Sequence, residues 1–226
     1  MKIIPTLLTT NTSEFIKQMD LFQKYYSRIQ LDITDGELVP NLTVQLREII
    51  DLIQRKKVIV SQNVTFDFHL MVNNYELALT EILELQELGM KVNLSLINAQ
   101  LRPNIPSLNP QYQFAIGLDI SPNTPIDTLA SHYDLDYIPS IQIMTVQPGF
   151  QGSPFLPEML NKIEQLRIQD YKGEIMIDGG VNNNTIPVIS KKQYKPDFLC
   201  IGSYLTKADD AFKERVESLQ ELDKKS

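Results

Sequence analysis

Two aspartates and a histidine stand at or near the ends of short apolar segments, where polar side chains can do chemistry. Asp32 lies in "RIQLDITDG", His69 in "FDFHLMV", and Asp178 ends "IMID" before two glycines. Carboxylates and imidazoles transfer protons in many enzymes. Each also has a simpler explanation, because an aspartate after a strand often only forms a turn and a histidine in an apolar run is often a buried core residue. Their functional meaning therefore depends on whether the fold brings them together.

The segment around Asp32 alternates apolar and polar side chains, which is the pattern of a β-strand. Gln30, Asp32 and Thr34 share its polar face, and Thr6 lies near the end of an earlier apolar run. The polar face of a strand normally meets water. This strand, however, leads into an Asp-Gly turn, as if the Asp32 carboxylate were directed at something other than water. Asp35 precedes a glycine, and Asp-Gly is an ordinary turn pair, so its role is predicted to be structural.

Glycine-rich turns follow three consecutive apolar segments near the C-terminal end of the sequence. These turns are "VQPGFQGSPF" at 146–155, "DGGV" at 178–181 and "IGS" at 201–203. Turns of this kind at helix starts expose backbone N–H groups, which bind phosphate without any lysine. Three of them in succession predict a phosphate site.

Short apolar runs alternate with amphipathic segments along the whole chain. Strands are predicted at 2–8, 28–34, 64–72, 90–97, 112–121, 137–146, 173–181 and 196–203. Helices are predicted at 11–26, 43–56, 74–89, 124–130, 153–169, 183–190 and 211–226. Strict alternation implies parallel strands joined by helical crossovers. Eight such units within 226 residues favour a single α/β domain over 1–226, a (β/α)₈ TIM barrel rather than an open sheet.

One crossover departs from this pattern. The segment 98–111, "NAQLRPNIPSLNPQ", contains Pro103, Pro106 and Pro110. Prolines at this spacing are incompatible with a normal helix. An irregular fourth crossover, extended or 3₁₀, is therefore predicted.

Composition excludes several classes of function. The net charge of −7 argues against nucleic acid as a partner, and no apolar run approaches the roughly 18 residues of a membrane span. The one cysteine, Cys200, allows no disulfide within the chain, which together with the lack of a signal-peptide pattern predicts a cytoplasmic location. The two histidines, His69 and His132, exclude a three-histidine zinc centre, and His132 is predicted to lie on the surface.

Nearly the whole sequence resembles the ribulose-phosphate 3-epimerase family, which includes the allulose-6-phosphate epimerases. The matching stretches are "PTLLTTN", "LDITDGELVPNLT", "FDFHLMV", "IMTVQPGFQGSPFLPEML", "IDGGVN" and "IGS". The resemblance implies a (β/α)₈ barrel that inverts C3 of a ketose phosphate, typically D-ribulose 5-phosphate to D-xylulose 5-phosphate. Family members assemble as dimers or hexamers, so a homo-oligomer is expected.

The resemblance also implies residue roles. Inversion next to a carbonyl needs two acid/base groups on opposite sides of a cis-enediolate, and Asp32 and Asp178 match that pair. Asp32, His69 and Asp178 also match ligands of a divalent metal (zinc, manganese or iron), which would stabilise the enediolate charge. Thr6 stands where the family has a substrate-contacting serine. The residues expected to bind substrate or its phosphate are Thr6, His69, Met71, Gly152, Gly179, Gly180, Gly202 and Ser203.

The chain departs from the family pattern at several positions. The family has His-x-Asp on strand two, whereas this chain has Gln30 followed by Leu31 and Asp32. An amide oxygen is a poorer ligand than histidine for zinc but is tolerated by harder ions such as manganese or magnesium. The family histidine after strand four is absent. The remaining departures replace methionine by Thr34, a Gly-Gly pair by Gln151-Gly152, and Asn-Pro by Ser121-Pro122.

Two functional hypotheses follow from these matches and departures. In the first, the chain is an active 3-epimerase of a pentulose or hexulose phosphate with an altered metal site. In the second, it is a catalytically impaired paralogue that binds sugar phosphate as a regulator or assembly subunit. Gln30 favours the second hypothesis. The retained pair Asp32 and Asp178 favours the first, because binding phosphate alone needs neither carboxylate.

Overall fold

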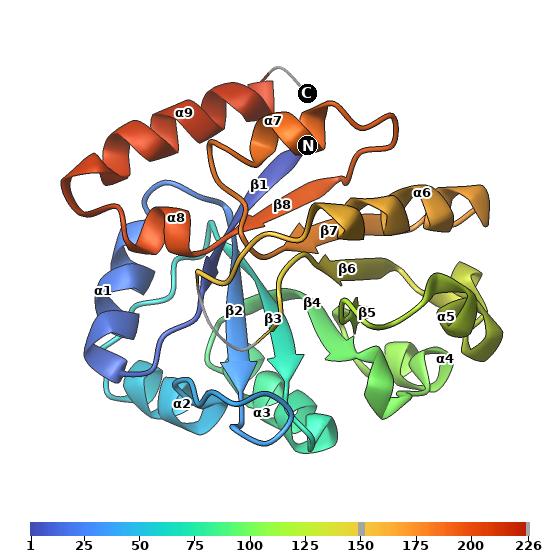
Figure 1. Cartoon of the computed structure of the whole chain (residues 1–226). Coiled ribbons are helices and arrows are strands. Elements are labelled where there is room, and N and C mark those ends of the chain that lie inside the picture. Colours follow the sequence, from blue (N-terminus) through green and yellow to red (C-terminus); the bar gives the residue numbers. More distant parts are fainter. Residues whose placement is uncertain (149–151, 225–226) are drawn as a thin grey trace.

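Eight parallel strands close into a barrel, so the predicted (β/α)₈ fold is confirmed (Figure 1). The computed structural model describes residues 1–148 and 152–224. Each strand pairs with the next in the chain, and β8 pairs with β1 to complete the closure. The strands are β1 (Lys2–Leu7), β2 (Arg28–Thr34), β3 (Thr65–Met71), β4 (Lys91–Asn98), β5 (Ala115–Ile120), β6 (Ser140–Met144), β7 (Glu174–Asp178) and β8 (Phe198–Ile201).

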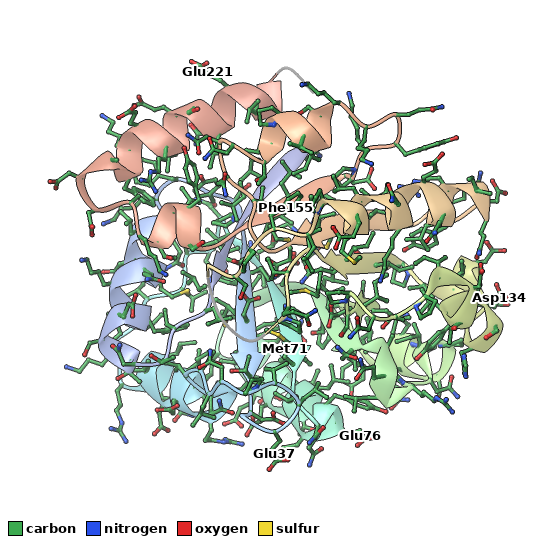
Figure 2. All side chains as sticks on the ribbon, in the orientation of Figure 1. Glu37, Met71, Glu76, Asp134, Phe155 and Glu221 are labelled. Atoms are coloured by element: carbon green, nitrogen blue, oxygen red, sulfur yellow. The ribbon has the colours of Figure 1, made fainter. Side chains whose placement is uncertain are left out.

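Helices surround the barrel and cover the outer faces of its strands (Figure 1). They are α1 (Thr12–Phe22), α2 (Leu46–Gln54), α3 (Tyr75–Glu87), α4 (Ile105–Leu108), α5 (Ile126–His132), α6 (Asn161–Ile168), α7 (Ile186–Ser190), α8 (Ser203–Thr206) and α9 (Phe212–Lys224). Figure 2 shows exposed acidic side chains such as Glu37, Glu76, Asp134 and Glu221 at the periphery of the molecule.

The polar face of β2 does not meet water but lines the inside of the barrel. Alternate residues of a barrel strand point inward and outward. The odd-numbered residues of β2 belong to the hydrophobic core, whereas Gln30, Asp32 and Thr34 face inward and are at most 5% exposed. Burial on both faces is thus compatible with an alternating sequence, because the inner polar groups contact one another.

Residues typical of helix ends stand at the ends of two helices. Asn11 caps α1, and its Oδ1 accepts a hydrogen bond from the backbone N–H of Glu14 at 2.9 Å. Gly89 follows the last residues of α3 with φ of +97°, a left-handed conformation that glycine adopts without strain. Both helices are shorter than predicted, because pattern marks a helix more reliably than it marks its ends.

The fourth crossover is irregular, as the prolines predicted. It consists of 3₁₀ segments at Ala99–Leu101 and Asn109–Gln111 around the short helix α4. The expectation of only extended or 3₁₀ structure was wrong for α4, because Pro106 lies in the first turn of that helix, where a missing N–H breaks no bond.

The helix predicted at 153–169 is also shorter than expected. Residues 153–156 form neither helix nor strand, Pro157–Leu160 form a 3₁₀ segment, and the α-helix begins only at Asn161. The strand predicted at 137–146 shortens to β6, because its first residue ends the 3₁₀ segment Leu135–Tyr137. The predicted elements nevertheless occur in the predicted order, with an additional short helix, α8, directly after β8.

A buried ion pair lies at the amino-terminal end of the barrel. Arg28 Nε lies 2.7 Å from Oδ2 of Asp67, whose other oxygen accepts a hydrogen bond from Asn93 at 2.9 Å. The guanidinium also lies over the ring of Phe198, 4.4 Å from its centroid. Asp67 is fully buried and has both a cation and an amide donor.

Candidate active site

Asp32, His69 and Asp178 come together inside the carboxyl-terminal end of the barrel. Parallel pairing of β2 with β3 places Asp32 beside His69, and barrel closure brings Asp178 from β7 to the same place. His69 Nδ1 lies 3.3 Å from Asp32 Oδ1 and 3.7 Å from Asp178 Oδ2. All three side chains are buried. The predicted convergence of two carboxylates and an imidazole therefore occurs.

Two glutamines lie against the carboxylates from inside the barrel. Gln30 Nε2 donates to Asp32 Oδ1 at 2.9 Å and to Asp178 Oδ2 at 3.1 Å. Gln142 Nε2 donates to Asp178 Oδ2 at 3.2 Å. The Cys200 thiol lies 3.5 Å from the amide oxygens of both glutamines, and its single proton can be donated to either of them. The amide nitrogen of Gln30, rather than its oxygen, thus faces the acidic pair.

The electrostatics of this cluster are dominated by burial and by negative charge. Burial raises the pKa of Asp178, and the nearby charge of Asp32 raises it further. Burial alone would lower the pKa of His69. Asp119, which lies on β5 behind His69, and Asp32 outweigh this effect and raise the pKa well above its ordinary value. Among the residues the structure describes, no lysine or arginine forms an ion pair with these three aspartates. The site therefore has an excess of negative charge.

The donor set fits a divalent cation. One ligand atom from each of Asp32, His69 and Asp178 lies within 4.8 Å of the others. Neither ring nitrogen of His69 has a partner at hydrogen-bond geometry in the described part of the chain, although both are buried. Two carboxylates and one imidazole suit manganese, iron or zinc. Gln30 could add its amide oxygen only after its amide group turned over.

The carboxylates open onto a cavity of about 490 Å³, which includes the space open to solvent at its mouth. The described residues that line it are Thr6, Leu8, Asp32, Met71, Met144, Val146, Pro148, Gly152, Ser153, Asp178, Gly179, Gly180, Val181, Cys200, Gly202 and Ser203. Figure 2 shows Met71 and Phe155 toward the middle of the molecule, away from the peripheral acidic residues.

The structure places the predicted substrate-binding residues in two groups. Thr6, Met71 and the predicted glycines and serine of the phosphate turns all line the cavity. His69 does not, because it is fully buried behind the carboxylates. The predicted turn at 146–155 includes Gly149, Phe150 and Gln151, which lie outside the described residues.

Backbone geometry explains the two glycines after Asp178. Gly179 and Gly180 have φ values of +112° and +66°, in the left-handed region that favours glycine. A Cβ on Gly179 would also approach Val146 to 2.4 Å. Thr145 holds this turn through its hydroxyl, which donates to the carbonyl oxygens of Asp178 and Gly179 at 2.9 and 2.6 Å. The turn can therefore place its backbone close to a ligand.

Several residues of the site were not identified from the sequence. They are Gln142 and Cys200 beneath the carboxylates, and Asp119 on β5 behind His69. The signal for Asp119 was present, because it is a polar residue at an inward-facing position of an otherwise apolar strand. The same alternation identified Asp32.

Asp35 has the structural role predicted for it. Its Oδ1 accepts from the backbone N–H groups of Glu37 and Leu38, and its Oδ2 accepts from that of Asn73 at 2.7 Å. The surface position predicted for His132 is also confirmed.

The fold and the site together define a class of protein: a (β/α)₈ barrel with an acidic, histidine-containing site at the carboxyl ends of its strands, where enzymes of this fold have their active sites. The model of the ribulose-phosphate 3 epimerase family matches residues 2–206. The chain belongs to that family.

Curated relatives and solved structures agree with this assignment at different levels. A rice protein (Oryza sativa subsp. japonica) named ribulose-phosphate 3-epimerase, cytoplasmic isoform, is 27% identical over 83% of this chain and 80% of its own length. A ribulose-phosphate 3-epimerase of Methanocaldococcus jannaschii is 29% identical over 84% of this chain and 77% of its own. The tryptophan synthase complex of Pyrococcus furiosus aligns with a TM-score of 0.62 at 16% identity, covering 97% of each chain. That likeness supports the fold alone.

No helix in the described part of the chain is long and apolar enough to cross a membrane.

Proposed function

We propose that this protein is a metal-dependent 3-epimerase of a ketose phosphate, with D-ribulose 5-phosphate and D-xylulose 5-phosphate as the first substrates to test. The observation that carries the proposal is the convergence of Asp32 and Asp178 on one cavity from strands 146 residues apart in the sequence. Membership of the epimerase family supports the reaction class.

The two carboxylates supply the acid and the base. Their contacts with Gln30, Gln142 and His69 engage Asp32 Oδ1 and Asp178 Oδ2. Among the described residues, no hydrogen bond or ion pair engages the other oxygen of either side chain. Those two oxygens are available to the substrate, so one aspartate removes the C3 proton while the other returns a proton to the opposite face.

The intermediate of this reaction is a cis-enediolate, whose negative charge must be stabilised beside two carboxylates. A divalent ion held by Asp32, His69 and Asp178 would supply that stabilisation. His69 lies behind the carboxylates, which suits a ligand of the ion better than a direct substrate contact. Burial keeps these groups away from bulk water, where their electrostatic effect would be weaker.

The remaining cavity residues bind and orient the sugar phosphate. The Thr6 hydroxyl is placed to contact the sugar, and the Met71 side chain forms an apolar wall. The phosphate lies against the turns that contain Gly152, Gly179–Gly180 and Gly202–Ser203, whose backbone N–H groups need no charged side chain to bind it.

Gln30 favours a second candidate function. Its amide nitrogen donates to both acid/base carboxylates, and these hydrogen bonds stabilise the negative charge without a metal. A paralogue that binds sugar phosphate without turning it over would need no metal at these carboxylates. The predicted cytoplasmic location and homo-oligomeric state apply to both candidates and stay predictions.

Exchange of the C3 proton separates the two candidates. The protein is incubated with D-ribulose 5-phosphate in deuterated water with Mn²⁺, and deuterium at C3 is followed together with formation of D-xylulose 5-phosphate. We expect both from the wild type, and a loss of at least about 100-fold in Asp32→Asn and Asp178→Asn. Asp20→Asn, on the exposed face of α1, is the matched control and keeps the wild-type rate. Binding of ketose phosphates without any exchange by the wild type would instead support the paralogue.

A further inference from the structure

A third carboxylate is buried beside the predicted metal ligands. Asp119 lies on β5, is fully buried, and is not among the described residues that line the cavity. Removing a charged carboxylate from water costs on the order of several kcal/mol unless partners compensate it. Asp119 does not touch the substrate cavity, so any role it has in the reaction must act through a neighbour.

The first neighbour of Asp119 fixes its orientation. Asn98 Nδ2 donates to Asp119 Oδ2 at 2.8 Å. The oxygen of the Asn98 amide accepts from the backbone N–H of Gln100 at 3.0 Å, so the nitrogen must face the carboxylate. Asn98 and Asp119 are also paired residues of adjacent strands. The carboxylate is therefore held in place from the side of β4.

The second neighbour is His69, whose two ring nitrogens face opposite acidic groups. Nε2 lies 3.4 Å from Asp119 Oδ2, whereas Nδ1 faces Asp32 and Asp178. An ionised carboxylate only accepts hydrogen bonds. Asp119 therefore favours a proton on Nε2. Asp32 and Asp178 favour a proton on Nδ1 in the same way, and a divalent ion bound between them would take the place of that proton.

We propose that Asp119 is a positioning residue that favours a proton on Nε2 of His69, 3.4 Å from its Oδ2, so that Nδ1 is presented as a metal ligand between Asp32 and Asp178. A carboxylate behind a ligating histidine fixes its tautomer and increases its basicity. The effect matters more in this chain because Gln30 occupies the position of the family's other strand-two ligand, leaving His69 as the one histidine of the donor set. The metal part of this inference rests on the proposed function, whereas the tautomer part does not.

The tautomer can be read directly by NMR after labelling with ¹⁵N-histidine. The chain has only two histidines, and exposed His132 serves as an internal reference. We expect the Nε2 of His69 to carry a proton with and without Zn²⁺, and its Nδ1 resonance to shift when Zn²⁺ is added. A His69 ring that is protonated on Nδ1 alone would overturn the proposal, and this measurement needs no variant.

Metal affinity provides the second readout, measured by competition with a chromophoric chelator for Zn²⁺. We expect Asp119→Asn to weaken Zn²⁺ binding about 10- to 100-fold. We expect Asn98→Ala, which removes the anchor of Asp119 together with the contacts of Asn98 to Gln100 and Ser121, to weaken it less. Ser95→Ala is the matched control, because Ser95 is fully buried on β4 and has no hydrogen-bond partner for its hydroxyl in the described structure. It keeps the wild-type affinity.

The outcomes separate this inference from the proposed function. If Asp119→Asn does not fold, the NMR of His69 in the wild type and the Zn²⁺ affinity of Asn98→Ala test the inference instead. Wild-type affinity in both variants, or no Zn²⁺ binding by the wild type, would overturn the metal-ligand role. A protein that lacks epimerase activity but shows the expected tautomer and the expected loss of Zn²⁺ affinity would refute the proposed function and leave this inference standing.

Discussion

The two ends of the barrel both bury carboxylates but compensate them in different ways. At the amino-terminal end, Asp67 has Arg28 at 2.7 Å and an amide donor from Asn93. At the carboxyl-terminal end, His69 is surrounded by Asp32, Asp119 and Asp178. In the described structure, their other hydrogen-bond donors are side-chain amides, and no lysine or arginine pairs with them.

This difference separates a structural ion pair from a binding site. Arg28 and Asn93 offset part of the cost of burying Asp67, although burial still raises the pKa of this carboxyl above its ordinary value. A buried cluster with excess negative charge lowers stability until a cation binds, and it holds that cation tightly for the same reason. The ion pair at the amino-terminal end therefore has a structural role, whereas the excess of carboxylates at the carboxyl-terminal end suits a binding site.

Breaking the amino-terminal ion pair should have the largest effect on stability. We expect Arg28→Met to lower the free energy of unfolding by about 3–5 kcal/mol, because Asp67 is left buried without its cation. Urea unfolding followed by circular dichroism measures this change. Arg55→Met is the control, since Arg55 pairs with Asp51 on the exposed surface, where such pairs contribute about 0–1 kcal/mol. Equal effects of the two substitutions would contradict the comparison.

A cation near the carboxyl-terminal end is hydrogen-bonded to the backbone, although the charge of Asp119 also acts on it. The ammonium of Lys162 is buried and donates, at 2.7–2.9 Å, to three carbonyl oxygens, those of Ser121, Pro122 and Thr124. We expect Lys162→Met to cost about 2–3 kcal/mol of stability, because these acceptors lose their donor. Lys213→Met, on exposed α9, should change stability by less than about 0.5 kcal/mol in the same unfolding assay. If the Lys162 variant were as stable as the Lys213 variant, these three carbonyl oxygens would not depend on Lys162 for their hydrogen bonds.

Stability without metal should depend on pH through Asp178. Burial and the charge of Asp32 raise its folded-state pKa to about 8, above the unfolded value. The folded state thus binds more protons than the unfolded state between about pH 4 and 8, so stability falls as pH rises through this window. We expect the melting temperature in EDTA to fall by several degrees between pH 5.5 and 8, and Asp178→Asn to reduce this slope. A wild-type slope of opposite sign would refute the excess negative charge at this end.

The smallest effect is expected at Asp35, just outside the site. Burial raises its pKa, but hydrogen bonds from the amides of Asn73, Leu38 and Glu37 outweigh this and lower it. Its stabilisation is therefore present above the unfolded pKa and is lost as pH falls through the lower folded value. We expect Asp35→Asn to cost about 0.5–1.5 kcal/mol at pH 7 and less at pH 3, with epimerase activity largely retained. A loss of activity comparable to that of Asp32→Asn would assign Asp35 to the reaction.

The sequence by itself determined the architecture and most of the candidate site. Alternating apolar runs and amphipathic segments encode strands and helices through their periods, which are local properties. The carboxyl ends of parallel strands must meet once the barrel closes, so Asp32, His69 and Asp178 could be placed together in advance. Segment ends were less predictable, because tertiary packing decides where α-helix gives way to 3₁₀ structure, as at Pro157–Leu160.

Only the tertiary structure decided which polar groups touch inside the barrel. Gln30 presents its amide nitrogen to both carboxylates and its amide oxygen to the thiol of Cys200, 170 residues away. The carboxylate of Asp119 behind His69 depends on the register of β3, β4 and β5. Periodicity states which way a side chain points, but a hydrogen bond requires distance and angle, and these exist only after closure has fixed the strands relative to one another.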